Sequence, residues 1–455
     1  MNCEIPRILI AGTGSGCGKT TVSCAVMKAL VDRGLKTAAF KCGPDYIDPM
    51  FHTRITGTRS TNLDSFFFDD STLTWLLAKN GAGMDVSVIE GVMGFYDGLG
   101  LVQSKGSSFD VARLTRTPAV LVVDGRGASL SIEAVIAGFL SLEPENTIKG
   151  VIINRCSSRV YEAISEDMRN RFGGRVVPLG YMPPMPDVSL ESRHLGLVTA
   201  AEVEGLSEKL SLLASQAEKT VDLDGLISLA KEAPALRYEP LGLPKHEKVR
   251  IAVARDRAFC FYYEDSLDVL RDMGAELVSF SPLEDAALPS AIDGLYLGGG
   301  YPELYAERLS ANKAMLSSVR EAVKGGLPTI AECGGFMYLT EEIEGFPMAG
   351  VLPGKCFDNK KLTRFGYVTL TAQQDNMLCR AGETIRGHEF HRWEAENTGS
   401  GFTAEKSGGK SWDCVFTGDT LYAGFPHFHF LSNTGFAEGF YGACLTEKKR
   451  HDREY

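Results

Sequence analysis

Residues 7–21 have the sequence RILIAGTGSGCGKTT, and this stretch decides the fold. Its apolar start, residues 8–11, is typical of a buried parallel strand. The glycines that follow allow backbone N–H groups to converge, and apolar residues then recur at helical spacing over residues 22–30. The order of strand, glycine-rich loop and helix predicts a phosphate-binding loop.

The residues of this loop are suited to hold a nucleotide. Converging amides and the positive end of a helix form an anion site, Lys19 can reach the terminal phosphates, and the Thr20 hydroxyl can bind magnesium. The common pattern G-x-x-x-x-G-K-[ST] would place its first glycine at Thr13, but the glycine here is Gly12. This longer loop resembles that of dethiobiotin synthetase and its relatives, in which the nucleotide drives ligation. The predicted nucleotide-binding residues of the loop are Gly14, Gly16, Gly18, Lys19, Thr20 and Thr21.

Length and composition limit the class of protein. A chain of 455 residues is too long for one typical core, so two or three domains are expected. No apolar run approaches the roughly 20 residues of a membrane span, and the start has no signal-peptide pattern. The net charge of −11 argues against a general nucleic-acid binder, and eleven cysteines without paired spacing indicate reduced thiols. We therefore expect a cytoplasmic protein with no nucleic-acid or membrane partner.

The first half alternates apolar runs with helical patterns. Runs at 37–40, 85–89, 118–123, 148–153 and 176–182 are typical of buried strands. This alternation predicts an α/β fold with a parallel sheet covered by helices.

Four acidic residues are expected at one edge of this sheet, because ligands bind where the carboxyl ends of parallel strands meet. Asp45 and Asp48 follow one predicted strand, Glu90 ends another, and Asp97 lies on the loop that follows. Hard cations prefer oxygen ligands, so the predicted magnesium ligands are Thr20, Asp48 and Glu90. Asp45, Asp48 and Asp97 are predicted to place magnesium or a reacting group. Turn formation beside prolines is the alternative for the first two aspartates.

Other polar residues near strand ends are candidate ligand contacts. Asn154 ends a predicted strand, where its amide can pair with a nucleotide base. Lys41 and Tyr46 lie beside the first two aspartates and are predicted to contact substrate. Arg193 and His194 bring a cation and an imidazole into one loop, which an anionic substrate would favour.

A second α/β unit is expected to begin at residues 249–254. Three glycines, Gly298 to Gly300, end a later predicted strand and allow amides to approach a reacting oxygen. Another strand delivers Cys333 into a glycine-lined turn before a helix, where helix amides can lower its thiol pKa. A buried inert thiol is the usual interpretation of a lone cysteine, but this turn favours a nucleophile.

Four histidines are candidate bases for the Cys333 thiol. His427 and His429, in the sequence His427-Phe428-His429, are preferred. His388 and His391 rank below them, because their segment lies in a long insertion.

These motifs together resemble the cobyrinic acid a,c-diamide synthase family, in which a dethiobiotin-synthetase-like phosphate-loop domain is joined to a class I glutamine amidotransferase domain. The match spans nearly the whole chain and rests on GTGSGCGKTT, KCGPDYIDPMFH, EGVMGFYDG, SRHLGL, LGGGYPE, AECGGFMYL and HFHF. The resemblance implies two domains, each with a mainly parallel sheet covered by helices. The expected parts are a synthetase domain at 1–233, a linker at 234–248, an amidotransferase domain at 249–445 and a polar tail at 446–455.

The resemblance also implies a reaction. Its substrates would be L-glutamine, ATP with Mg²⁺, and a polycarboxylate tetrapyrrole, cobyrinic acid. Cys333 would attack glutamine and release ammonia, with the oxyanion held by the amides of Gly299, Gly300 and Gly334. ATP would phosphorylate the a and c acetate carboxylates, and ammonia would then displace phosphate from the acyl phosphates. The product would serve cobalamin biosynthesis.

The ending of the second domain departs from the related pattern. Class I amidotransferases usually have His-x-Glu, whereas His-x-His stands here. Alignment on Phe430 places His427 as the base and His429 in the orienting position.

Two alternative functions stay open at this point. One is the same diamidation of nickel sirohydrochlorin in methanogen coenzyme synthesis. The other is a regulatory phosphate-loop ATPase with a degenerate second domain, against which Cys333 and its histidines argue. The central metal, the order of amidation, the ammonia route and the oligomeric state, with a homodimer as one option, are not decided by the sequence.

Overall fold

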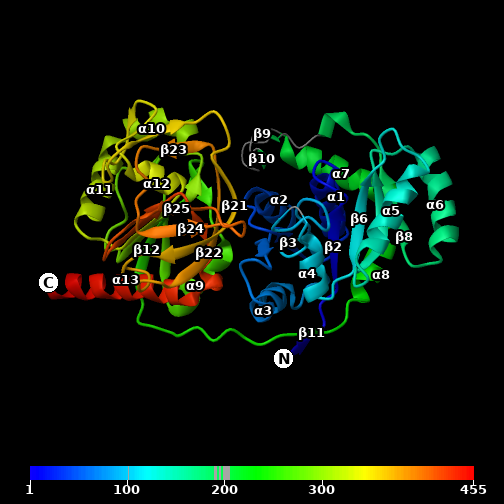
Figure 1. Ribbon diagram of the computed structural model, residues 1–455, viewed down its shortest axis with the longest axis horizontal. Helices are drawn as coiled ribbons and strands as arrows, with labels where there is room; N and C mark the ends of the chain where they lie inside the picture. The colour runs from blue at the N-terminus through cyan, green and yellow to red at the C-terminus, as the bar shows by residue number, and fades with distance from the viewer. Residues whose placement is uncertain (101, 189–191, 194–195, 198–204, 455) are drawn as a thin grey trace. The chain divides into compact units, whose positions relative to one another are not determined.

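The computed structural model describes residues 1–100, 102–188, 192–193, 196–197 and 205–454. The chain divides into two compact units, Met1–Leu241 and Gly242–Tyr455. Each unit is an α/β structure (Figure 1), as expected from the sequence.

The first unit is built on a seven-stranded sheet in the order β4-β3-β5-β2-β6-β7-β8, and every pairing is parallel. The central strands β2, β3 and β5 are buried along their whole length, so helices cover both faces. The strands are β2 Arg7–Gly12, β3 Thr37–Cys42, β4 Thr61–Leu63, β5 Val86–Glu90, β6 Ala119–Asp124, β7 Ile148–Asn154 and β8 Val177–Met182.

The helices of this unit alternate with the strands along the chain. They are α1 Lys19–Asp32, α2 Ile47–Thr56, α3 Asp70–Gly81, α4 Ser108–Leu114, α5 Ser131–Leu142, α6 Ser158–Phe172, α7 Leu206–Thr220 and α8 Leu223–Lys231. The last two helices both bury a leucine-rich side. Helix α2 and strand β4 have no counterpart in the sequence predictions.

The predicted linker is partly built into the first unit. Leu236–Arg237 forms β11, which pairs with β1, Asn2–Cys3. The buried guanidinium of Arg7 donates to the backbone carbonyl of Pro234 at 2.8 Å. Because this interaction ties Pro234 to the central strand, an irregular segment begins several residues later than the predicted start.

The second unit contains a six-stranded sheet in the order β14-β12-β15-β17-β27-β26. All its pairings are parallel except that of the edge strand β26. The strands are β12 Arg250–Ala254, β14 Glu276–Phe280, β15 Gly294–Leu297, β17 Thr329–Glu332, β26 Phe416–Thr417 and β27 Leu421–Gly424. The helices are α9 Glu264–Met273, α10 Ala306–Ala311, α11 Lys313–Lys324, α12 Gly334–Leu339 and α13 Thr434–Glu454.

Two further sheets occupy the segment that sequence analysis treated as an insertion. An antiparallel five-stranded sheet has the order β25-β24-β21-β22-β28, and a four-stranded sheet has the order β19-β18-β20-β23. The strands are β18 Glu342–Ile343, β19 Phe346–Pro347, β20 Lys355–Asp358, β21 Arg364–Ala372, β22 Thr384–His391, β23 Trp393–Ala395, β24 Phe402–Glu405, β25 Ser411–Cys414 and β28 His427–Phe428.

The expected polar tail at 446–455 is helical as far as Glu454. Helix α13 buries Phe436, Phe440 and Cys444 in the second unit, and Glu447 pairs with Arg450 one turn later. The buried side anchors the helix, and the charged last turns extend it.

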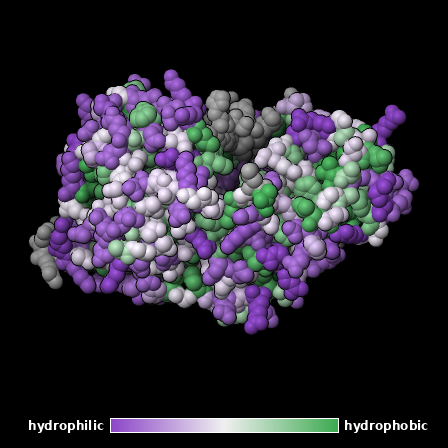
Figure 2. Space-filling view, viewed as in Figure 1, coloured by the Kyte–Doolittle hydropathy of each residue, from purple (hydrophilic) through white to green (hydrophobic). Residues whose placement is uncertain are grey.

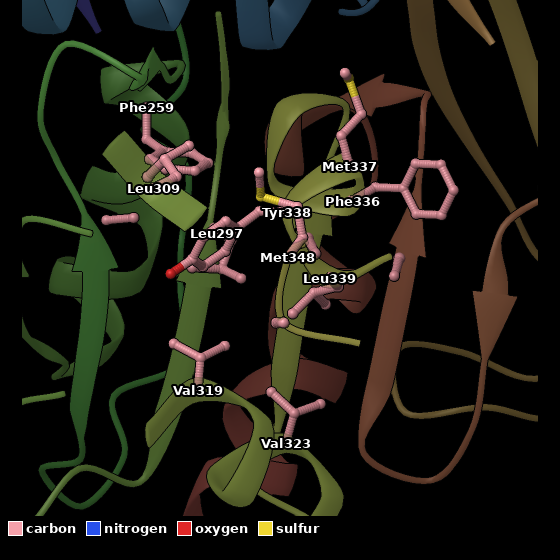
Figure 3. Packing of buried hydrophobic residues seen from close by; sticks show 14 of the residues in the cluster. Phe259, Leu297, Leu309, Val319, Val323, Phe336, Met337, Tyr338, Leu339 and Met348 are labelled. Carbon is pink, nitrogen blue, oxygen red and sulfur yellow. The ribbon is translucent and has the colours of Figure 1, made fainter. Parts of the chain in front are cut away.

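Short helix α12 is anchored in the hydrophobic core of the second unit. Phe336, Met337 and Leu339 of this helix are buried beside Leu297 and Met348 (Figure 3). This packing fixes the residue that precedes the helix, Cys333. On the face of the molecule in Figure 2, hydrophilic residues are spread over each unit. Within the described part of the chain, no helix is both long and apolar enough to span a membrane.

Candidate active sites

The phosphate-binding loop lies between β2 and α1, as predicted. Gly16 and Gly18 have φ angles of 78° and 90°, which only glycine adopts without strain. The Asn154 amide donates to the Cys17 carbonyl at 2.9 Å, and a side chain at Gly18 would overlap this amide. Asn154 therefore braces the loop, and its contact with a base stays a prediction.

A second residue that supports the loop, Arg155, was not predicted from the sequence. Arg155 donates to the Gly16 carbonyl at 2.6 Å and forms an ion pair with Asp124 at 2.8 Å. Arg155 directly follows Asn154, the last residue of β7, and this position is the feature of the sequence that points to its role. Both contacts are made to loop carbonyls and not to the loop N–H groups that are expected to bind phosphate.

Glu90 lies at the centre of the first site. Its Oε1 accepts a hydrogen bond from the Thr20 hydroxyl at 2.6 Å, and its Oε2 lies 2.8 Å from His52 Nε2. Lys19 Nζ lies 3.8 Å from Oε1. Burial alone would raise the pKa of Glu90, but Lys41 and His52 hold it well below its usual range. The carboxylate is therefore ionised beside the residues expected to bind phosphate.

Lys41 joins the ends of two strands to a helix. Its ammonium group pairs with Asp48 of α2 and with Glu90 of β5 at 3.1 Å, and it donates to the Gly91 carbonyl at 3.1 Å. Lys41 is only 2% exposed. Burial and the charge of Glu90 raise the pKa of Asp48. The structure thus gives Lys41 an internal role, and its contact with substrate stays a prediction.

A hydroxyl and an ionised carboxylate, Thr20 and Glu90, form a donor set that fits magnesium. Asp48, the third predicted ligand, is connected to Glu90 through Lys41. Among the described residues, no three His, Cys, Asp or Glu side chains are grouped to hold a metal ion by themselves. Magnesium commonly takes one or two carboxylates and completes its coordination with water and substrate phosphates, so this sparse donor set agrees with a nucleotide-bound ion.

Asp45 and Asp97 stabilise local turns. Asp45 Oδ1 accepts from the backbone N–H of Ile47 at 2.7 Å at the start of α2. Asp97 is exposed and accepts from the backbone N–H of Gly94 at 2.9 Å. These contacts agree with the turn-forming alternative for Asp45, and a role of either residue in transfer stays a prediction.

The remaining predicted substrate contacts are less fully defined. Tyr46 is buried directly before α2. Arg193 ends β9, Ser192–Arg193, whose backbone pairs with β10, Gly196–Leu197. His194 lies outside the described residues.

Cys333 stands at a sharp turn between β17 and α12. Its φ of 49° lies in the left-handed region, which is uncommon for a residue with a side chain and is often found at functional sites. Its N–H donates to the Gly424 carbonyl at 2.7 Å. Burial raises the pKa of the Cys333 thiol, the charge of Glu303 adds to this, and the Gly334 N–H opposes it. The expectation of a lowered pKa is therefore wrong, because desolvation outweighs the helix amides.

His427 is held by Glu332, which is not among the site residues predicted from the sequence. Its Nδ1 lies 3.2 Å from Glu332 Oε2, and the other carboxylate oxygen accepts from the Tyr296 hydroxyl at 3.2 Å. A carboxylate accepts hydrogen bonds, so Nδ1 carries the proton and Nε2 is left as the basic atom. Glu332 directly precedes the nucleophile in the sequence, and this adjacency was the signal.

His429 does not take the orienting position that was predicted for it. Its Nδ1 accepts a hydrogen bond from the backbone N–H of Leu431 at 3.1 Å, and its ring packs on Tyr263. Burial lowers the pKa of His429 to about 3. The orienting group of His427 is Glu332, supplied from a different strand.

The two lower-ranked histidines have other partners. The ring of His388 stacks on His427 with 5.1 Å between centroids, and burial lowers the pKa of His388 well below its usual range. His391 lies between two acceptors, the Trp393 carbonyl at 2.6 Å and Glu389 at 2.8 Å. Both ring nitrogens of His391 are thus engaged within this sheet, and neither is directed at Cys333 in these contacts.

The predicted oxyanion glycines, Gly299, Gly300 and Gly334, lie beside His427 and Cys333. A Cβ on Gly299 would lie 3.2 Å from His427 Nε2, and one on Gly334 would lie 3.1 Å from the backbone nitrogen of Gly300. Gly299–Gly300 forms β16, which pairs with β13, Phe259–Phe261. The close packing of these backbones explains why only glycine fits, and their hold on an oxyanion stays a prediction.

Comparison with known proteins follows the division into two units. Residues 8–198 match the CobQ/CobB/MinD/ParA nucleotide binding domain, and residues 250–435 match the CobB/CobQ-like glutamine amidotransferase domain. The chain is 42% identical to cobyrinate a,c-diamide synthase of Listeria monocytogenes, over 96% of this chain and 99% of that protein. It belongs to the cobyrinate a,c-diamide synthase family.

Other members of the cobyrinate a,c-diamide synthase family match over a similar extent. The enzyme of Thermoplasma volcanium is 41% identical over 99% of both chains, and that of Caldanaerobacter subterraneus is 40% identical over 96% of this chain and 98% of the other. The nucleotide-binding match contains Lys19 and Glu90, and the amidotransferase match contains Cys333, Glu332 and His427.

Proposed function

We propose that this chain catalyses the ATP- and glutamine-dependent amidation of the a and c acetate carboxylates of cobyrinic acid, in cobalamin biosynthesis. The observation that carries the proposal is the contact of His427 with Glu332, the residue directly before Cys333, in one chain with the phosphate-binding loop. The substrate itself is inferred from the names of relatives that match over nearly their full length. A degenerate amidotransferase domain would not retain a buried base with an orienting carboxylate.

Glutamine hydrolysis begins with a protonated thiol, since burial raises the pKa of Cys333. Nε2 of His427 takes this proton while Glu332 holds the proton on Nδ1 and stabilises the imidazolium. The sulfur attacks the side-chain amide of glutamine, and the amides of Gly299, Gly300 and Gly334 receive the developing oxyanion. The imidazolium then protonates the leaving nitrogen, ammonia departs, and water hydrolyses the thioester.

Activation of the carboxylate takes place in the first unit. The loop amides and Lys19 bind the phosphates of ATP, and a substrate carboxylate attacks the terminal phosphorus, which gives the acyl phosphate and releases ADP. Thr20 and Glu90 would hold a magnesium ion, which would neutralise phosphate charge during this transfer. Ammonia displaces phosphate from the acyl phosphate to give the amide. The second carboxylate repeats the cycle to give the diamide. ATP and glutamine are abundant in the cytoplasm, where we place this reaction.

Mass spectrometry of the full-length protein with candidate substrates tests the proposal. Cobyrinic acid and nickel sirohydrochlorin are incubated separately with ATP, magnesium and glutamine, and each amidation replaces a carboxyl hydroxyl by an amino group. Formation of cobyrinic acid diamide supports the proposal. Diamide from nickel sirohydrochlorin alone, or ATP hydrolysis without any amide, overturns it.

A further inference from the structure

A cavity of about 200 Å³ lies in the second unit, among the sheets of the predicted insertion. Arg364, Glu389 and His391 line one side of it, and Trp412 and Phe425 also contribute to its wall. Drug-sized ligands occupy sites of about 300–1,000 Å³, so this cavity suits a smaller molecule such as a single amino acid. None of the catalytic steps above uses Arg364, Glu389 or His391.

The cavity presents both signs of charge at defined positions. Arg364 of β21 and His391 of β22 are cross-strand partners and therefore share a sheet face. The Arg364 guanidinium lies over the Trp412 ring at 4.6 Å from its centroid. Within the described part of the chain, no carboxylate lies within 4 Å of this guanidinium in an ion pair. This cation–π contact restricts the guanidinium, whose planar set of N–H donors matches a carboxylate ligand.

The negative charge comes from carboxylates on the neighbouring strands. Glu389 is buried, with one oxygen on His391 and the other accepting from Trp412 Nε1 at 3.1 Å. Each oxygen keeps a lone pair for a further donor. Glu394 also lines the cavity and is partly exposed. A ligand with an ammonium group and a carboxylate group matches these charges.

The wall of the cavity is continuous with the turn that holds Cys333. Phe425 stacks on His391 with 4.1 Å between centroids and an interplanar angle of 9°. On its other side it contacts Phe336 of α12, and the preceding residue, Gly424, accepts the Cys333 N–H. The charge of Glu389 contributes to the raised pKa of the Cys333 thiol, so the two are within electrostatic reach.

We propose that this cavity binds the α-amino acid end of glutamine, with Arg364 receiving the α-carboxylate and Glu389 and Glu394 receiving the α-ammonium group. This inference rests on the proposed function, which makes glutamine the nitrogen source. It gives His391 a positioning role: its ring contacts Glu389 at 2.8 Å and packs against Phe425, which follows Gly424 beside the nucleophile turn.

Binding of L-glutamine to the full-length Cys333→Ala protein, measured by calorimetry, tests this site without hydrolysis. Adding Arg364→Met should raise the Kd on the order of tenfold to a hundredfold, because a charge-assisted pair is lost. Arg392→Met is the matched control, since Arg392 pairs with Asp358 at 3.1 Å and does not line the cavity. Equal Kd values for the two variants would overturn the proposal.

A second measurement covers the case in which Arg364→Met does not fold. Glutaramate keeps the amide and one carboxylate of glutamine but lacks the ammonium group. The Cys333→Ala protein should bind glutamine more tightly than glutaramate, and adding Glu394→Gln should reduce this ratio several-fold. An unchanged ratio overturns the proposal. Failure of the proposed ligation would instead appear as absence of diamide in a protein that still binds glutamine through Arg364.

Discussion

Glu332 Oε2 lies 3.2 Å from His427 Nδ1, although the two residues are 95 positions apart in the chain. The contact forms because β17 ends at Glu332 beside β27, and the chain reaches His427 three residues after β27. A carboxylate that fixes the imidazole tautomer is worth a large part of the catalytic rate in comparable triads. We infer that Glu332, directly before Cys333, takes the place of the third group of a His-x-Glu ending.

We predict that Glu332→Gln lowers the glutaminase kcat on the order of 10²-fold to 10⁴-fold. The amide can present a donor to Nδ1 and favour the wrong tautomer, while the buried volume is conserved. Steady-state ammonia release is the measurement. Glu341→Gln is the control, because Glu341 is exposed and lies nine residues after Glu332, the last residue of β17. The assignment would be reversed if His429→Gln lowered kcat by this factor while Glu332→Gln kept full activity.

Alkylation of Cys333 should depend on pH in a way that reports its raised pKa. A thiol whose pKa is raised by burial stays protonated at neutral pH, so iodoacetamide should react slowly there and faster as the pH rises past about 8.5. In His427→Ala, where the base is absent, the rate should still be rising at the highest pH tested. A plateau at or below neutral pH in this variant would mean that the helix amides activate the thiol after all.

The two chemistries should separate in Cys333→Ala. Glutamine-dependent amidation should be abolished, because the nucleophile is gone, whereas amidation with added ammonium salt should persist in the first unit. Diamide formation from each nitrogen source is followed by mass spectrometry. Loss of both activities in a folded protein would contradict the division of labour between the units.

Lys19→Ala should remove synthesis from both nitrogen sources, because acyl phosphate formation precedes either. The loss of one cation on a transferring phosphoryl group should raise the barrier by several kcal/mol, on the order of 10³-fold in rate. Lys28→Ala, on the same helix but paired with Asp32, is the control. Near wild-type synthesis with ammonia in Lys19→Ala would exclude the loop as the site of activation.

The sequence predicted the parts of this protein that local pattern determines. The strand, glycine loop and helix at residues 7–30 and the turn at Cys333 are local, because each needs specific backbone angles within a few residues. The cluster of Glu90 with Lys41 and His52 was only partly predicted, since it depends on which strand ends become neighbours. The Glu332–His427 contact and the strands β21 and β22 were not predicted, because each depends on pairing between residues that are far apart in the chain.

Variants of the aspartates beside the first sheet can distinguish a structural role from a catalytic one. Asp45 lies one residue before the N-cap of α2 and accepts the Ile47 N–H, whereas Asp69 is the N-cap of α3 and accepts the Thr72 N–H at 2.8 Å. Asp69→Asn therefore measures the effect of removing a carboxylate charge at a helix start away from the site, since Asn keeps the acceptor oxygen. If Asp45, Asp48 and Asp97 also place the acyl phosphate for attack, their Asn variants should slow transfer while ATP still binds.

A slower transfer step has a specific consequence for an enzyme that amidates two positions. The singly amidated intermediate would dissociate before its second round, so we expect monoamide to accumulate in Asp45→Asn, Asp48→Asn and Asp97→Asn, but not in Asp69→Asn. The mono-to-diamide ratio, with ATP affinity measured in parallel, distinguishes the two roles. A ratio in Asp45→Asn equal to that in Asp69→Asn would leave Asp45 with a structural role at the start of α2 alone.

Asp48→Asn carries a further consequence. Lys41 would then lose its ion pair with Asp48 and keep that with Glu90. Reduced thermal stability should therefore accompany any change in the product ratio of this variant.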